Sequence, residues 1–66
     1  MELKIKVIKT NSFPGDTFRR IEINGIPIMG ISKNYSKLWE CDLNSKEFKT
    51  IADAKEYAIK LYNINL

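Results

Sequence analysis

The chain of 66 residues contains no histidine and only one cysteine, Cys41. The absence of histidine removes the commonest metal ligand and the usual general base near neutral pH. A single cysteine excludes an intrachain disulfide and is typical of proteins in a reducing compartment. We therefore expect a cytoplasmic protein that holds no metal and no other cofactor.

Long apolar runs and targeting signals are also missing. The chain has no run of about 20 apolar residues that would span a membrane, and no basic start followed by an apolar core that would mark a signal peptide. Its three glycines are spread along the chain, so no glycine-rich phosphate loop is present. We expect one domain over residues 1–66, with no membrane partner and no small-molecule substrate.

Few residues are suited to catalysis. Cys41 lies in an alternating segment, where a cysteine behaves as a small core residue. Glu40 and Asp42 share one strand face, where carboxylates commonly pair with basic residues of neighbouring strands. A chain this short rarely builds a substrate cleft. The sequence therefore predicts a non-enzymatic protein.

Basic residues exceed acidic residues by 11 to 8, which gives a net charge of +3 and a pI near 9.1. The lysines and arginines are interleaved with glutamate and aspartate and form no stripe, unlike those of many dedicated nucleic-acid binders. The small excess of basic residues is explained first by solubility. A surface that contacts phosphate groups is the alternative explanation.

Two segments of the first half predict strands. Residues 2–8 alternate apolar and polar side chains, which is typical of a half-buried strand. Asn24 and Gly25 separate residues 21–23 from 26–28 and favour a type I′ hairpin turn. A two-residue turn places Ile21 opposite Ile28 and Ile23 opposite Ile26, so we expect four isoleucines on the core side.

The same register predicts which side chains lie on the opposite face. Pro27 has no N–H and belongs at a sheet edge or a bulge. Gly30 is a predicted bulge in this strand if the strand at residues 38–43 pairs with it. The opposite face then carries Phe18, Arg20, Glu22, Pro27, Met29 and Ile31.

Residues 38–61 predict a further strand and a helix. Trp39, Cys41 and Leu43 alternate with polar residues over 38–43, and this strand pairs with either the first or the third strand. Thr50 opens a helix with apolar side chains at Ile51, Ala54, Ala58 and Leu61. The predicted fold is α+β: an antiparallel sheet of three or four strands with one C-terminal helix packed on one face.

One helix covers only one face of a sheet, so the other face is open for binding. Apolar side chains rimmed by charge on such a face indicate a protein interface. The alternatives are that residues 11–16, including Phe13, cover the patch, or that the register is shifted by one residue. We expect a protein partner or a homodimer to bind at Phe18, Arg20, Met29, Ile31 and Leu38.

The turn at residues 32–37 is the best candidate for contacts to phosphate groups. It carries two lysines, a tyrosine and small hydrogen-bond donors, which are suited to phosphate and base contacts but are also usual in a solvated turn. Nucleic-acid binding is therefore the alternative function.

A resemblance supports that alternative. Residues 37–60, and above all Phe48-Lys49-Thr50-Ile51-Ala52-Asp53-Ala54, resemble the arm-type DNA-binding domain of tyrosine recombinases. That family packs a three-stranded sheet on one helix and places the sheet in the DNA major groove. The lysine-, asparagine- and isoleucine-rich composition also resembles small proteins of phages and mobile elements. Together with the turn, the resemblance implies nucleic-acid contacts from Lys4, Lys6, Arg20, Lys33, Tyr35 and Lys37.

Overall fold

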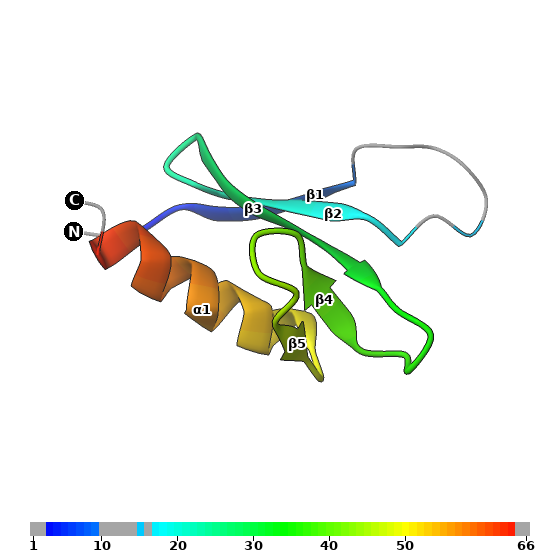
Figure 1. The fold of residues 1–66 in the computed structure, drawn as a ribbon. Coiled ribbons are helices and arrows are strands. Elements are labelled where there is room, and N and C mark those ends of the chain that lie inside the picture. Colours follow the sequence, from blue (N-terminus) through cyan, green and yellow to red (C-terminus); the bar gives the residue numbers. More distant parts are fainter. Residues whose placement is uncertain (1–2, 10–14, 16, 65–66) are drawn as a thin grey trace.

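A computed structural model describes residues 3–9, 15 and 17–64. The described residues form five strands, β1 (Ile5–Lys9), β2 (Arg19–Ile23), β3 (Ile26–Lys33), β4 (Trp39–Cys41) and β5 (Glu47–Phe48), followed by helix α1 (Ile51–Ile64). The strands form one antiparallel sheet in the order β1-β2-β3-β4-β5. The chain therefore runs back and forth across the sheet and ends in a helix that packs against it (Figure 1). The predicted α+β class is confirmed.

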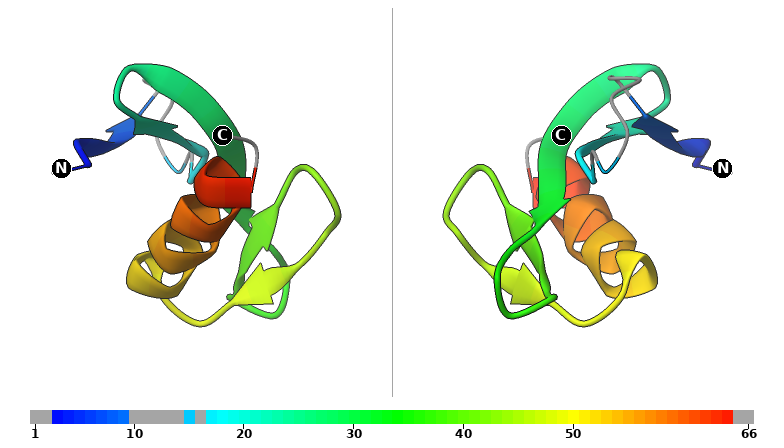
Figure 2. Two further views of the ribbon diagram at one scale, coloured as in Figure 1. Left: turned by 90° about the vertical axis from the view of Figure 1, so that its left-hand side faces the viewer. Right: turned by 90° about the vertical axis from the view of Figure 1, so that its right-hand side faces the viewer.

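The sheet bends around α1 (Figure 2). The helix packs mainly against β2, β3, β4 and β5. Ala54 and Ala58 are fully buried beneath the sheet, and their small side chains allow the helix to lie close to it. The helix begins as predicted, because the backbone N–H of Asp53 donates to Thr50 Oγ1 at 3.2 Å and satisfies one free donor of the first turn.

The strand at Trp39–Cys41 pairs with β3, which answers the question that the sequence left open. Cys41 is buried as predicted and Trp39 is half-buried, but Leu43 is 59% exposed because the strand ends before it. The chain turns over residues 42–45 and returns as β5. The sheet thus gains a fifth strand of two residues that the sequence did not predict.

The turn between β2 and β3 is the predicted one. Asn24 and Gly25 both have positive φ angles, 54° and 81°, as a type I′ turn requires. The pairing beyond the turn differs from the prediction: Glu22 lies opposite Pro27, but Ile21 lies opposite Met29. One extra residue, Ile28, is therefore inserted into β3 as a bulge.

The bulge reverses the predicted orientation of Met29 and Ile31. Because it shifts the alternation by one residue, Met29 and Ile31 turn to the helix side and are buried, with 4% and 0% exposure. Ile26, predicted in the core, is 52% exposed at the end of the hairpin, and Ile28 is half-buried. The core instead consists of Ile21, Ile23, Met29, Ile31, Cys41, Phe48, Ala54 and Ala58.

Pro27 lies at a position where its missing N–H costs no hydrogen bond within the described sheet. It stands directly before the extra residue of the bulge, and β4 pairs only with the later part of β3, at Ile31–Lys33. No described strand therefore requires an N–H from Pro27. Gly30, the predicted bulge, is a regular strand residue with a different function, described below. The predicted loop at 11–16, apart from Gly15, lies outside the described residues.

Candidate protein-binding face

The face of the sheet opposite α1, called the helix-free face below, is built by alternation from five strands. Opposed residues in an antiparallel pair share a face. One row across this face comprises Ile8, Arg20 and Gly30, and the hydrogen bond from the Asp42 N–H to Gly30 O (2.9 Å) extends it. A second row comprises Lys6, Glu22 and Pro27.

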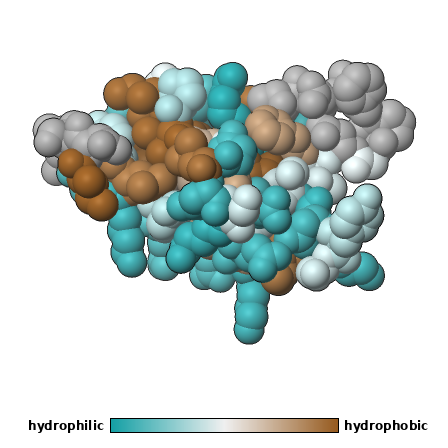
Figure 3. Space-filling model, viewed as in Figure 1, coloured by the Kyte–Doolittle hydropathy of each residue, from teal (hydrophilic) through white to brown (hydrophobic). Residues whose placement is uncertain are grey.

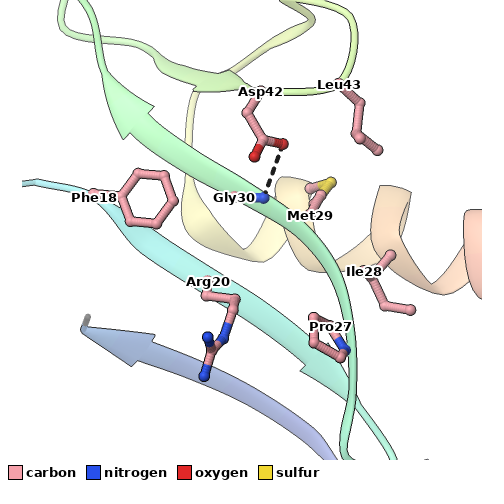
Figure 4. Close-up of a pocket in the computed structure, with 8 residues that line it drawn as sticks. All are labelled: Phe18, Arg20, Pro27, Ile28, Met29, Gly30, Asp42 and Leu43. Carbon is pink, nitrogen blue, oxygen red and sulfur yellow. Dashed lines mark hydrogen bonds between the residues drawn. The ribbon is translucent and has the colours of Figure 1, made fainter.

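Gly30 forms the floor of a depression in this face. A Cβ atom at Gly30 would lie 2.5 Å from Phe18 Cζ and 2.8 Å from Asp42 Oδ2, so only a glycine permits this approach. The Phe18 ring lies beside the Gly30 backbone, whose N–H donates to Asp42 Oδ1 at 3.0 Å (Figure 4). The depression has a volume of about 220 Å³ and is lined by Phe18, Arg20, Pro27, Ile28, Met29, Gly30, Asp42 and Leu43.

The walls of the depression are mainly apolar and its rim is charged. Leu43 and Ile28 lie on one side of Gly30 and Phe18 lies on the other (Figure 4). Leu43 is 59% exposed. In the space-filling view, apolar side chains gather near the β2–β3 turn and the adjoining part of β3, and hydrophilic ones dominate around the first half of α1 (Figure 3).

The charges on the helix-free face nearly cancel. Arg20 Nη2 lies 2.9 Å from Glu22 Oε2, and the Glu22 side chain is only 14% exposed beside it. Among the described residues, strand alternation places three basic and four acidic side chains on this face: Lys4, Lys6, Arg20, Glu22, Glu40, Asp42 and Glu47. This face therefore presents mixed charge rather than a positive surface.

The predicted protein-binding residues fall into three groups. Phe18 and Arg20 lie on the helix-free face, the first half-buried and the second exposed. Met29 and Ile31 belong to the core, so their prediction as surface residues was wrong. Leu38 is half-buried at the end of the β3–β4 hairpin. The sequence missed Gly30, Asp42 and Leu43; only Pro27, which fits a sheet edge or a bulge, was a local sign of the change of register.

The predicted nucleic-acid-binding residues do not share one surface. Lys4, Lys6 and Arg20 lie on the helix-free face, whereas Lys33 lies on the other, with its Nζ atom 5.5 Å from the centre of the Trp39 ring. Tyr35 is fully exposed at the tip of the β3–β4 hairpin. Lys37 follows it with a positive φ angle of 63°.

A second hollow lies beside this hairpin. It has a volume of about 580 Å³ and is lined by Ser32, Lys33, Asn34, Tyr35 and Glu40. The Asn34 side chain holds the hairpin in shape: its Oδ1 accepts from the N–H groups of Ser36 and Leu38, and its Nδ2 donates to Glu47 Oε2. The hairpin tip is thus well supported, and Tyr35 stands out from it.

Comparisons of the chain with protein-family models, with curated proteins and with solved structures found no match. Within the described residues, no group of three or more histidine, cysteine, aspartate or glutamate side chains is arranged to hold a metal ion. No helix in the described part of the chain is long and apolar enough to cross a membrane.

Proposed function

We propose that the chain is a non-enzymatic binding module that recognises a protein, either a second copy of itself or a different partner, through its helix-free face. The observation that carries the proposal is the depression over Gly30. It combines apolar walls with charged groups at its rim, which is the composition of a protein interface. An apolar side chain of the partner fits between Phe18 and Leu43, and Arg20 and Asp42 flank it.

The charge balance supports protein rather than DNA as the ligand of this face. A sheet that enters a DNA groove gains most of its affinity from cations that face phosphate groups. On the helix-free face the described carboxylates outnumber the described cations, and Arg20 already pairs with Glu22. We also propose a cytoplasmic location, because the buried Cys41 is a free thiol.

The proposal is tested by affinity capture from cells that carry the gene, with matched variants of the immobilised chain. Leu43→Asp places a charge in the depression, whereas Ile64→Asp makes the same kind of change at an exposed position of α1. Quantitative mass spectrometry should find proteins that the wild type and Ile64→Asp retain and Leu43→Asp loses. Light scattering of the same variants identifies self-association. The proposal fails if the chain stays monomeric and Leu43→Asp retains every captured protein.

Nucleic-acid binding remains a second candidate because of one observation. Tyr35 is fully exposed at the end of a supported hairpin that also carries Lys33 and Lys37, and exposed aromatic rings flanked by cations stack on unpaired bases. This function, and the resemblance to recombinase arm-type domains, predicts an affinity for DNA or RNA that falls steeply with salt. Tyr35→Ala should then weaken binding at about 50 mM salt, and an absence of binding at that salt excludes the function.

A further inference from the structure

We propose that the open edge of β1 accepts an extended, acidic segment of a partner protein as an additional strand of the sheet. This inference concerns a surface other than the depression over Gly30 and goes beyond the proposed function. It rests on the backbone of β1, on the difference between the two edges of the sheet and on the charge of β1.

Within the described residues, one side of the β1 backbone pairs with no strand. The N–H of Lys4 donates to Asn24 Oδ1 at 3.0 Å, and the N–H of Asn24 donates to Lys4 O at 2.9 Å. Hydrogen-bonding residues alternate along an antiparallel strand, so Lys6 and Ile8 also bond toward β2. Ile5, Val7 and Lys9 consequently direct their N–H and C=O groups outward, where no described strand pairs with them.

The two edges of the sheet differ in length and protection. β5 comprises two residues and leads into the N-terminus of α1 through Thr50. Very short strands and covered ends are common protections of a sheet edge. β1 has five residues without a proline or a bulge in its pairing with β2. The longer edge is therefore the one that can add a strand.

The positive charge at β1 favours an acidic partner strand. Lys4 and Lys6 lie on the helix-free face at this edge, and Lys9 lies on the opposite face. None of the three forms an ion pair with a described residue. A second copy of β1 would bring lysines close to one another across the new pair, which is unfavourable. A strand with carboxylates at alternate positions would instead place opposite charge beside Lys4 and Lys6 on the helix-free face.

Apolar side chains complete the site. Ile5 and Val7 lie on the helix side of the sheet but are only half-buried, because α1 packs mainly against β2–β5. β1 forms the outer margin of the sheet, at the side away from β4 and β5 (Figure 2). A partner strand that alternates acidic and apolar residues would therefore match both faces of β1, with its apolar residues beside Ile5 and Val7.

The experiment titrates the ¹⁵N-labelled chain with a short, capped peptide in which glutamate and valine alternate, at low salt. The amide signals of Ile5, Val7 and Lys9 should shift, with a dissociation constant below about 1 mM. A peptide that alternates lysine and valine should bind about tenfold more weakly or not at all. The double substitution Lys4→Glu and Lys6→Glu should reverse the preference between the two peptides.

Val7→Pro is the most specific variant, because it removes an outward N–H and no bond to β2. It should fold, as measured by circular dichroism, and should not bind the acidic peptide, whereas Val7→Ala should bind it. The proposal is overturned if no β1 amide shifts at millimolar peptide, if both peptides bind equally, or if folded Val7→Pro binds normally. Leu43→Asp should leave peptide binding unchanged, so a failure at this edge is distinct from a failure at the depression over Gly30.

Discussion

Gly30 holds the helix-free face in its present shape. Its missing Cβ leaves room for the Phe18 ring, and its backbone N–H fixes the Asp42 carboxylate at 3.0 Å. Both side chains border the depression that we propose as the binding site. The requirement for glycine here is one of space.

Gly30→Ala should destabilise the fold by about 1–3 kcal/mol, because the new methyl group would overlap the Phe18 ring. Urea unfolding measures this change, and Ser32→Ala on the same strand is the control. The cost of Gly30→Ala should fall when Phe18 is also replaced by alanine, because the clash is then removed. An equal cost in both backgrounds would contradict the described contact.

Lys37 lies in a left-handed conformation with a φ angle of 63°, which is strained for a residue with a Cβ atom. Its N–H donates to Asn34 O at 3.0 Å to close the β3–β4 turn. Lys37→Gly should therefore raise the free energy of unfolding by about 0.5 kcal/mol. The test is the thermal midpoint, with Lys49→Gly at an exposed position as the control. A lower midpoint for Lys37→Gly than for the wild type would contradict this account.

At the scale of the element, the N-terminus of α1 depends on Thr50. The bond from the Asp53 N–H to Thr50 Oγ1 satisfies a donor that has no partner within the helix. Thr50→Ala should cost about 1 kcal/mol of unfolding free energy, whereas Thr50→Ser, which keeps the hydroxyl, should cost much less. Urea unfolding of both variants separates the contribution of the hydroxyl group to stability from that of the methyl group. An equal loss of unfolding free energy in the two variants would exclude the cap.

The bulge in β3 makes a sharp prediction about two neighbouring apolar residues. Met29 is 4% exposed and its Sδ atom lies 3.5 Å from Cys41 Sγ, whereas Leu43 is 59% exposed. Met29→Asp buries an unpaired charge and should unfold the domain, since a chain of this size has little stability in reserve. Leu43→Asp should remain folded. Circular dichroism compares the two variants. A folded Met29→Asp variant would contradict the bulge and support the register expected from the sequence.

The same bulge explains why the sequence predicted part of this face incorrectly. The run from Ile26 to Ile31 has apolar side chains at both odd and even positions, so alternation alone assigns neither face. The I′ turn and the helix cap were predictable because each depends on neighbouring residues only. The position of the bulge depends on how β3 packs on α1, and Pro27 was the single local sign of it. β5 was missed because two residues are too few to show alternation.

At the scale of the whole molecule, the fold separates two kinds of surface. Among the described residues, α1 and the core side of the sheet contribute the eight buried hydrophobic side chains, including Ala54 and Ala58. The opposite face carries the depression over Gly30 with charges of both signs, and the open edge of β1 carries lysines. This arrangement supports protein recognition at the face and a distinct, charge-selective contact at the edge.

The central claim is that a protein binds the helix-free face. The most direct measurement follows the amide signals of the ¹⁵N-labelled chain while the proteins captured by the wild type are added. The account predicts that the shifted or broadened signals cluster at Phe18, Arg20, Gly30, Asp42 and Leu43, while those of the exposed side of α1 remain unchanged. Changes confined to α1 or to the hairpin around Tyr35, with the signals around Gly30 unaffected, would contradict it.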